Sequence, residues 1–253
     1  MKTAVVNLLH GALDLLLPRH CILTGRPLLP VERACVAPEV LREAALTGAD
    51  YCTRCGAPQG KGVGVIGVCG RCERAKTGYS TAEIAAVGDY RGVLREICVA
   101  HKFAGAIAAA EPLAAWLTAL LIDRGISESV ELVCPVPLHP FRELSRGYNQ
   151  SALIARSVAK ALELRYEARL LQRLRNTDPQ ARLSASQRAK NIEGAFSASR
   201  RGKKLIEGAR VLLVDDVMTT GATLRAAAKA LKEAGAKSVH GAVVARAALD
   251  EDA

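Results

Sequence analysis

Aromatic residues are scarce in this sequence, and it contains no long uninterrupted apolar run. Phe, Trp and Tyr make up 4% of the 253 residues, although half of the chain is hydrophobic, mostly as Ala, Val and Leu. Such a composition favours a parallel sheet covered by helices over a β-sandwich. The longest apolar region, Phe103 to Ile122, contains Glu111 and Pro112, which argues against a membrane span.

Features of secretion are lacking as well. The apolar stretch over residues 1–18 is interrupted by His10 and Asp14 and has no small-residue cleavage site, so we expect no signal peptide. Four of the eight cysteines form two Cys-x-x-Cys pairs, which is typical of metal binding rather than of disulfide bonding. These observations predict a cytoplasmic protein without a membrane span.

Positive charge is concentrated in one part of the chain. The net charge is +10, and residues 141–210 contain sixteen Lys and Arg against six Asp and Glu, whereas the remainder holds nineteen of each kind. A local positive field favours phosphorylated metabolites or nucleic acid as partners. A solvated basic surface would have the same composition, so charge alone leaves both interpretations open.

The two Cys-x-x-Cys pairs predict a zinc ribbon. They consist of Cys52 with Cys55 and Cys69 with Cys72, and thirteen residues separate the pairs. Two tight knuckles with this spacing bring four thiolates into a tetrahedron, the usual geometry of structural zinc sites. Residues 1–80 are rich in Cys, Gly and Pro and are too few to fold on apolar burial alone. We therefore expect an N-terminal helix and zinc-ribbon domain over residues 1–80.

From residue 81 onward the pattern alternates between strands and helices. Strands are predicted at residues 82–90, 131–137, 210–214 and 238–245, and helices at residues 92–101, from 111, at 149–164 and at 222–234. Residues 173–191 are polar, basic and irregular, which indicates a loop. This alternation is typical of an α/β fold with a parallel sheet, here over residues 81–253.

A candidate ligand site follows the strand at residues 210–214. Asp215 and Asp216 come directly after its apolar VLLV segment, and Thr219, Thr220, Gly221, Ala222 and Thr223 then lead into a helix. Ligands of parallel α/β sheets bind beyond the carboxyl ends of the strands. Hydroxyls, backbone N–H groups and a helix N-terminus suit a phosphate, whereas the acids suit ribose hydroxyls. The alternatives are an acidic strand end in another nucleotide-binding fold and a response-regulator receiver, which lacks the Thr-Thr-Gly turn.

The segment VLLVDDVMTTGAT resembles the 5-phosphoribosyl 1-diphosphate binding motif of type I phosphoribosyltransferases. The resemblance implies that the acidic pair, our candidate catalytic residues, contacts the ribose 2- and 3-hydroxyls and that the Thr-rich loop holds the 5-phosphate. Three further segments, CPVPLHPFRELSRGYNQ, RNTDPQARLSASQRAKNIEGAF and YRGVLREICVAHKFAG, are together with the cysteine pairs similar to the ComF family. That family implies a zinc ribbon fused to a phosphoribosyltransferase domain, and a link to natural competence and incoming single-stranded DNA.

Basic side chains are the candidate ligands of the diphosphate. They are Arg142 and Arg146 after a strand end, Arg175 and Arg188 in the predicted loop beside Thr177 and Gln180, and, as a weaker candidate, Lys102 on a helix surface. Cleavage at the anomeric carbon places negative charge on the leaving diphosphate, which arginines and Mg²⁺ stabilise. We expect Mg²⁺ to be held mainly by substrate oxygens and waters. Each arginine taken singly would suit a surface salt bridge equally well.

Two questions stay open on the sequence alone. Many members of the family carry a second pair of cysteine knuckles upstream, where this chain has only Cys21 and Cys35, with His20 as a third ligand and no fourth, so we expect that site to be lost.

The chain is either an enzyme with an unknown acceptor or a sugar-diphosphate-binding protein that acts on DNA or as an adaptor. A purely structural zinc module leaves the Asp-Asp turn unexplained. Aromatic residues for base stacking are few, and no base pocket is evident.

Overall fold

The computed structural model describes residues 19–29, 34–43, 51–59, 67–74, 80–103, 106–175 and 192–247. The predicted N-terminal helix and most of the predicted loop at residues 173–191, including Thr177, Gln180 and Arg188, lie outside the described residues. No helix among the described residues is both long enough and apolar enough to cross a bilayer.

Five parallel strands form the central sheet, in the order β1-β7-β6-β2-β3. Their bounds are Ile84–Asp89 for β1, Leu132–Pro135 for β2, Arg165–Tyr166 for β3, Arg210–Met218 for β6 and Ser238–Arg246 for β7. The middle strand, β6, has a continuous apolar run at residues 211–214, because both faces of the sheet are covered. The predicted α/β class with a parallel sheet is confirmed.

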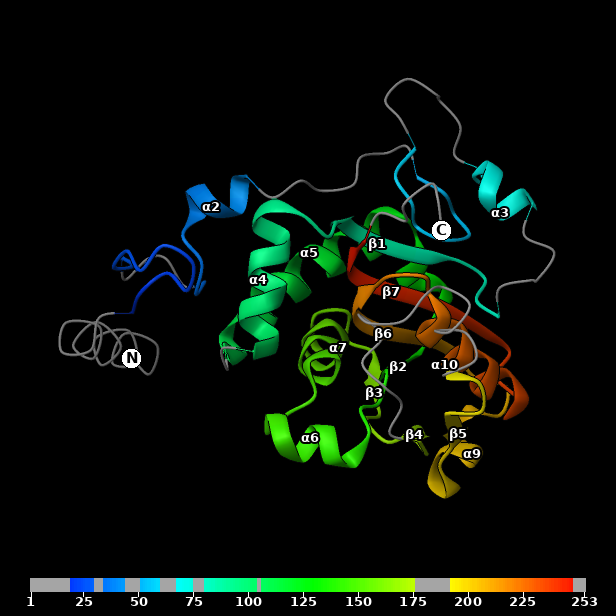
Figure 1. The fold of residues 1–253 in the computed structure, drawn as a ribbon. Helices are drawn as coiled ribbons and strands as arrows, with labels where there is room; N and C mark the ends of the chain where they lie inside the picture. Colours follow the sequence, from blue (N-terminus) through cyan, green and yellow to red (C-terminus); the bar gives the residue numbers. More distant parts are fainter. Residues whose placement is uncertain are drawn as a thin grey trace, which may run out of the picture.

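Helices cover both faces of this sheet (Figure 1). Their bounds are Gly92–Phe103 for α4, Ala110–Asp123 for α5, Gln150–Ala161 for α7 and Ala222–Glu233 for α10. Leu212 of β6 joins the core formed with α4, α5 and α7, whereas its neighbour Leu213 joins the core formed with α10. Successive residues of a strand point to opposite faces, so one apolar strand supplies both cores.

Two helix N-termini are fixed near the carboxyl end of the sheet. The Asn149 side chain caps α7 by accepting from the Ala152 N–H at 3.3 Å, and its amide donates to Val136 O, just beyond β2, at 3.1 Å. α10 begins after Gly221, whose φ of +73° favours glycine. The sheet end, the start of α7 and the start of α10 therefore surround the same space.

β6 continues to Met218, beyond its predicted end at residue 214, and so contains both acids of the pair. The extension is held by pairing with β7, in which Val217 lies opposite Ala245 and Met218 opposite Arg246. Aspartate is a poor strand former, but pairing with a neighbouring strand overrides that weak preference.

Several short helices and strands were not predicted from the sequence pattern. They are β3, the antiparallel hairpin of β4 (Leu171–Arg173) and β5 (Phe196–Ala198), and the helices α6 (Pro140–Arg146) and α9 (Arg200–Ile206). Each has seven residues or fewer, which is too short for hydrophobic periodicity to reveal. α6 starts with a proline, which is favoured in a first helical turn, and none of its residues is buried.

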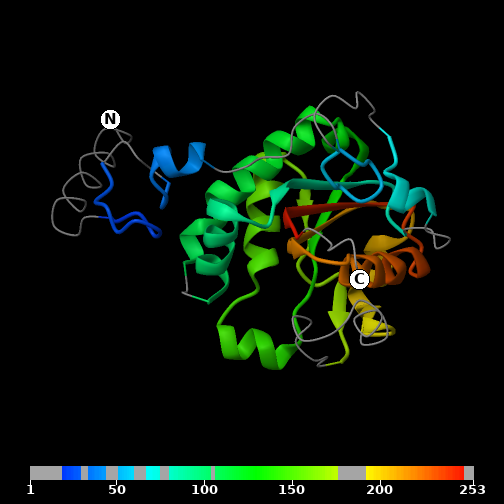
Figure 2. The same ribbon diagram turned by 45° about the horizontal axis from the view of Figure 1, so that its top comes forward.

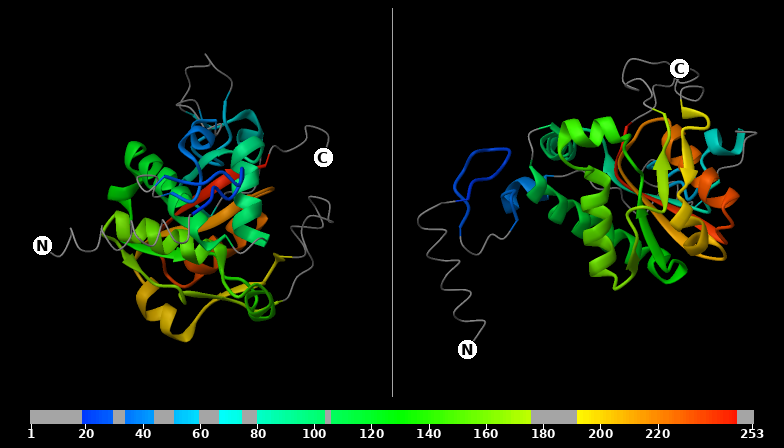
Figure 3. Two further views of the ribbon diagram at one scale, coloured as in Figure 1. Left: turned by 90° about the vertical axis from the view of Figure 1, so that its left-hand side faces the viewer. Right: turned by 90° about the horizontal axis from the view of Figure 1, so that it is seen from below.

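The described parts of two cysteine-bearing segments lie in different places. Residues 19–43, which include α2 (Pro38–Arg42), lie beside α4, whereas residues 51–74, which include α3 (Gly70–Arg74), lie beside β1 (Figures 1 and 3). The Ile84 N–H donates to Thr53 O at 3.1 Å. The second segment thus contacts the outer edge of the sheet.

Candidate functional site

A pocket of about 400 Å³ lies at the carboxyl ends of β2 and β6. Its wall includes the acid pair, the loop after β6, the end of α4, helix α6, the start of α7 and strand β4. This is the edge of a parallel sheet at which ligands bind. The elements that meet here are far apart in the sequence, so the fold assembles the site.

The two acids of the pair have different surroundings. Asp215 accepts from Ser151 Oγ at 2.8 Å and from the Asp216 N–H at 3.0 Å. Asp216 accepts from the Val217 N–H at 2.8 Å, and Lys102 Nζ lies 3.6 Å from its Oδ2. Ser151 therefore orients Asp215, while Lys102 balances the charge of Asp216.

Burial, followed by the nearby charge of Asp216, raises the pKa of Asp215 to about 7. The hydrogen bond from Ser151, the Asp216 N–H and the charge of Lys102 act in the opposite direction. Near neutral pH Asp215 can therefore be either protonated or ionised. A strongly perturbed acid in a concave pocket is typical of functional sites.

The loop at residues 219–223 joins the acid pair to α10. Thr219 and Thr223 line the pocket. Thr220 Oγ1 accepts from the Ala222 N–H at 3.4 Å, and Arg225 Nη1 donates to Thr220 O at 2.8 Å. Helix α10 has twelve residues, and its N-terminus carries partial positive charge. Hydroxyls, a helix start and a guanidinium therefore meet in one loop, as a phosphate site requires.

Cationic side chains line the same pocket. They are Lys102, Arg142, Arg146 and Arg173. Arg146 Nη1 donates to Gln150 Oε1 at 2.9 Å, and its guanidinium lies 5.4 Å from the centroid of the Phe103 ring. Burial lowers the pKa of Arg146 and of Arg173, although arginine stays charged in proteins. Acids and cations in one pocket suit a polyanion that also carries hydroxyl groups.

Most of the predicted site residues come together. The pocket wall includes Asp215, Asp216, Thr219, Thr223, Lys102, Arg142 and Arg146. Thr220, Gly221 and Ala222 shape the loop but are not part of that wall. Arg175 is also absent from it, since its exposed guanidinium donates to Glu193 O at 2.9 Å. Arg188 lies outside the described residues.

Several residues of the wall were not predicted as site residues, among them Arg173, Ser151 and Gln150. Arg173 ends the short strand β4 and is only 8% exposed, yet its sequence neighbourhood reads as the start of a loop. Ser151 and Gln150 lie in the first turn of α7. The signal for these two was the Asn149 cap, which places a helix start beside the end of β2.

The four predicted zinc ligands form one cluster. The Sγ atoms of Cys52, Cys55, Cys69 and Cys72 lie within 4.8 Å of one another, and those of Cys55 and Cys69 are 3.8 Å apart. Four sulfurs bound tetrahedrally at about 2.3 Å from zinc would be separated by about 3.8 Å. The cluster therefore fits a zinc ion. Within the described ranges no other group of three metal-binding side chains occurs, so His20, Cys21 and Cys35 form none.

Arg246 joins this cluster to the sheet. It is the last residue of β7, and it is buried, with Nε donating to Cys55 O at 3.1 Å and Nη2 lying 3.7 Å from Cys55 Sγ. Gly56 has a φ of +68°, and an added Cβ there would lie 2.9 Å from Ile84 O. The cysteine cluster thus packs tightly on the sheet, with a guanidinium beside the sulfur of Cys55.

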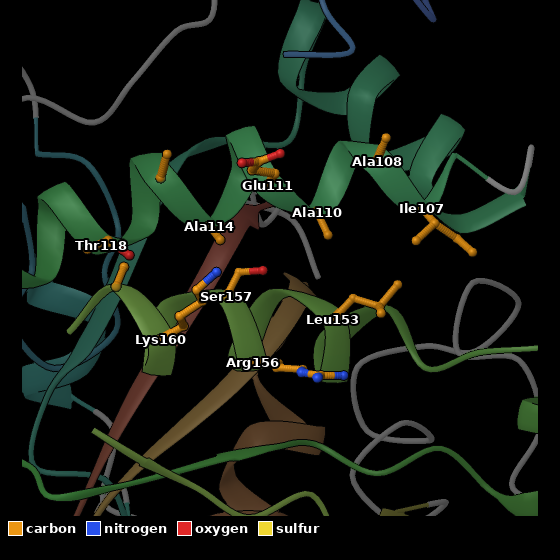
Figure 4. A pocket seen from close by; sticks show the side chains of 12 residues that line it. Ile107, Ala108, Ala110, Glu111, Ala114, Thr118, Leu153, Arg156, Ser157 and Lys160 are labelled. Carbon is orange, nitrogen blue, oxygen red and sulfur yellow. The ribbon is translucent and has the colours of Figure 1, made fainter. Parts of the chain in front are cut away.

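A larger hollow of about 640 Å³ lies between α5 and α7 (Figure 4). Its wall is mostly apolar, with Glu111 on α5 and with Arg156 and Lys160 on α7. This hollow lies in the helix layer, and neither the acid pair nor the Thr-rich loop contributes to its wall. The smaller pocket at the strand ends is therefore the candidate site.

A parallel sheet with two acids at the end of its middle strand, followed by a Thr-rich loop, defines a phosphoribosyltransferase-type domain. In agreement, residues 149–252 match the family described as the phosphoribosyl transferase domain. A solved glutamine phosphoribosylpyrophosphate amidotransferase from B. subtilis overlaps 58% of this chain and 30% of its own at 22% identity. The TM-score is 0.37.

The chain belongs to the ComF family of competence proteins. It is 31% identical over 182 residues to Competence protein F of Haemophilus influenzae, an alignment that covers 71% of this chain and 78% of the relative. DNA utilization protein YhgH of Escherichia coli K12 is 29% identical over 204 residues, covering 79% and 86% of the two chains. Competence protein ComFC of Bacillus subtilis is 29% identical over 190 residues, covering 73% and 72%.

Proposed function

We propose that the pocket binds 5-phosphoribosyl 1-diphosphate with Mg²⁺, in a cytoplasmic protein that serves the uptake or use of DNA. One observation supports this ligand: Asp215 and Asp216, the loop at residues 219–223 and four cationic side chains lie around one pocket. The DNA role is drawn from the relatives, which are called competence and DNA utilization proteins.

Each part of the pocket matches a part of this ligand. Asp215 and Asp216 accept hydrogen bonds from two neighbouring ribose hydroxyls, and the Thr-rich loop donates to the 5-phosphate. Lys102 and the pocket arginines face the diphosphate. When bound, Mg²⁺ would neutralise part of the diphosphate charge while substrate oxygens and waters hold most of its coordination sphere.

Transfer of the phosphoribosyl group is one outcome of this binding. The bond between the anomeric carbon and a diphosphate oxygen breaks, and the acceptor forms the new bond to that carbon. Negative charge grows on the leaving diphosphate, where Arg142, Arg146 and Arg173 stabilise it. Diphosphate release in the presence of a panel of nucleobases tests this reaction.

Binding without turnover is the second outcome. In that case the sugar diphosphate acts as a signal that changes how the protein handles DNA, which the names of the relatives favour. Tight binding without diphosphate release would support it.

We propose zinc as the metal of the four-cysteine cluster and residue 80 as the boundary between the zinc-ribbon domain and the phosphoribosyltransferase-like domain. The sulfur spacing supports the metal. The change near residue 80 from a cysteine-rich segment to alternating strands and helices supports the boundary.

Thr220→Val is expected to weaken binding of 5-phosphoribosyl 1-diphosphate about tenfold. The substitution keeps the shape of the side chain but removes one hydroxyl from the phosphate loop, and a hydrogen bond to a charged group contributes about 1.5–3 kcal/mol. Calorimetric titration in Mg²⁺ measures the change. Thr118→Val, on α5 in the other hollow, is the matched control and should bind normally. Equal affinity of Thr220→Val and the wild type would show that the Thr220 hydroxyl does not contribute to binding of the phosphate.

Single-stranded DNA is expected to bind through the basic stretch, with an affinity that falls steeply with salt. Arg200, Lys203 and Lys204 are exposed on α9, away from the acid pair, whereas Arg201 pairs with Glu167 at 3.4 Å. Changing the three exposed cations to Gln should reduce the salt slope by about 2, since each phosphate contact contributes about 0.7 on single strands. Sugar-diphosphate affinity should not change.

Two further pairs of substitutions test which cations bind DNA and which bind the sugar diphosphate. Arg142→Gln with Arg146→Gln should weaken both DNA and sugar-diphosphate binding, because these arginines line the pocket. Lys229→Gln with Lys232→Gln on α10, outside residues 141–210, is the charge-matched control and should change neither. A flat anisotropy signal for the wild type at low salt would end the DNA proposal for this chain.

A further inference from the structure

Arg246 contacts the cysteine cluster with its side chain and two strand ends near the pocket with its main chain. Its buried guanidinium donates from Nε to Cys55 O at 3.1 Å, and its Nη2 lies 3.7 Å from Cys55 Sγ. The segment at residues 51–59, cyan in Figure 2, lies beside β1, and β7 is the next strand of the sheet. Arg246 ends β7 and therefore lies at the edge of the sheet that carries the candidate pocket.

The main chain at Arg246 holds two strand ends that lead into the pocket. The Tyr90 N–H, one residue beyond β1, donates to Arg246 O at 2.8 Å, and Tyr90 lines the pocket. On the other side of β7, Met218 of β6 lies opposite Arg246, and the Ala247 N–H donates to Met218 O at 2.8 Å. The end of β7 therefore fixes the ends of both neighbouring strands.

Met218 connects this strand end to the Thr-rich loop. Its side chain is buried against the Gly221 turn, where a Cβ added to Gly221 would lie 3.3 Å from Met218 Sδ. Thr219 directly follows Met218 and lines the pocket, and α10 begins directly after Gly221. The loop proposed to hold the 5-phosphate thus starts one residue after the strand end that pairs with Arg246.

The buried guanidinium of Arg246 depends on Cys55, because arginine keeps its charge in proteins. The side chain is 8% exposed, and among the described residues both of its hydrogen-bond acceptors belong to Cys55. If Cys55 were no longer ordered, a buried charge would be left unpaired, which is strongly unfavourable. The end of β7 would then shift to bring the guanidinium to water, and Tyr90 and Met218 would lose their partner.

We infer that Arg246 is a positioning residue that links the cysteine cluster to the ligand pocket, so that zinc and the sugar diphosphate strengthen each other's binding. Cys55 is ordered when the cluster holds its metal, Cys55 then holds Arg246, and Arg246 holds the strand ends beside the pocket. Such coupling is reciprocal, and each ligand typically raises the affinity for the other by about 5-fold to about 150-fold. This inference rests on the proposed function, because both zinc and the sugar diphosphate are proposals.

The zinc affinity of the 253-residue chain, with and without 5-phosphoribosyl 1-diphosphate, tests this link. Competition with a chromophoric chelator measures the affinity, with excess Mg²⁺ in both samples. The sugar diphosphate should raise the zinc affinity of the wild type about tenfold. In calorimetry, zinc-depleted protein should bind the sugar diphosphate about tenfold more weakly than zinc-loaded protein. A zinc affinity that does not change with the sugar diphosphate would overturn the inference.

Arg246→Met tests the residue itself. Methionine is unbranched and uncharged, so it can stay buried without an acceptor at Cys55. The variant should bind zinc and the sugar diphosphate, but neither should change the affinity for the other. A role of Arg246 in fold stability alone would weaken both affinities and keep the tenfold effect. The same tenfold effect in Arg246→Met and in the wild type would therefore contradict the assignment.

Arg210→Met is the matched control for this variant. Arg210 begins β6 at the opposite edge of the sheet and pairs with Glu131 at 3.2 Å. The substitution removes a paired guanidinium from the same sheet but leaves the contact with the cysteine cluster intact. The tenfold effect of each ligand on the other should therefore be kept, and its loss in Arg210→Met would overturn the assignment to Arg246.

Amide hydrogen exchange tests the link without the sugar diphosphate. Zinc removal from the wild type should speed exchange of the Tyr90 and Ala247 amides, by about tenfold. The Val136 amide, which donates to Val214 O at 2.8 Å, should not respond. In Arg246→Met, exchange of the Tyr90 and Ala247 amides should not depend on zinc. Zinc-dependent exchange in a wild type that does not bind the sugar diphosphate would reject the proposed ligand and support the link. Sugar-diphosphate binding that does not depend on zinc would reject the link alone.

Discussion

Replacing Asp215 and Asp216 together with Asn is expected to reduce affinity for 5-phosphoribosyl 1-diphosphate at least about a hundredfold. Two carboxylates that accept from ribose hydroxyls would be lost, and each charge-assisted hydrogen bond contributes about 1.5–3 kcal/mol. Calorimetric titration in Mg²⁺ at pH 8 measures the loss, because this pH lies above the raised pKa of Asp215, about 7. Asp123→Asn, an exposed aspartate at the end of α5, is the control and should bind normally. Wild-type affinity in the double variant would reject the site.

In the protein without ligand, Asp215→Asn should increase the stability of the fold, although it weakens ligand binding. Because the pKa of Asp215 is raised to about 7, the folded protein keeps a proton that the unfolded chain releases near pH 4. The stability due to that proton is full below about pH 4 and is lost as the pH rises through about 7. At pH 8 Asp215→Asn should therefore raise the free energy of unfolding, by up to about 4 kcal/mol. At pH 4 the variant should be little more stable than the wild type. Thermal melts of both proteins at pH 4 and at pH 8 would show the difference. A lower melting temperature at pH 8 would contradict this account.

Cys52→Ser is expected to abolish zinc binding and to unfold the cysteine-bearing segment at residues 51–74. The wild type should hold one zinc per chain, and zinc binding supplies about 10–16 kcal/mol of folding free energy in small zinc modules. The sheet should stay folded but lose stability, because Arg246 would lose its ordered partner at Cys55. Metal analysis and amide hydrogen exchange measure the two effects.

Cys21→Ser is the matched control for the zinc experiment. Cys21 is also buried but lies outside the four-cysteine cluster. The zinc content of the Cys21→Ser variant should therefore equal that of the wild type. Two tightly held zinc ions per wild-type chain, with one lost in Cys21→Ser, would show that a second site is completed after all. An unchanged zinc content in Cys52→Ser would contradict the four-cysteine assignment.

The long strands and helices could be predicted because each has a strong local signal. The VLLV run and the Gly221 turn mark the end of β6 and the start of α10, and the acid pair between them locates the site. The four-cysteine cluster follows in the same way from spacing alone.

The rest of the site depends on contacts between distant residues. Arg173 reaches the pocket only because β4 pairs with β5, twenty-three residues further along the chain at its nearest end. The charge excess over residues 141–210 divides between the pocket and α9, which no composition reveals. Two of the three phenylalanines, Phe103 and Phe141, are exposed in the fold, which composition does not reveal.

The contact between the cysteine module and β1 has a consequence for dissecting the protein. β1 is the outermost strand of the sheet, and the Ile84 N–H bonds to Thr53 O on its open side. A fragment that starts at residue 81 would uncover this strand edge and leave the Arg246 guanidinium without Cys55. Uncovered edges pair with other chains, so the fragment should aggregate. It would also lack the buried residues Cys21, Leu28, Val36, Ala37 and Val40, which belong to the core formed with α4, α5 and α7. We therefore expect that the two parts on either side of the proposed boundary at residue 80 cannot be produced apart.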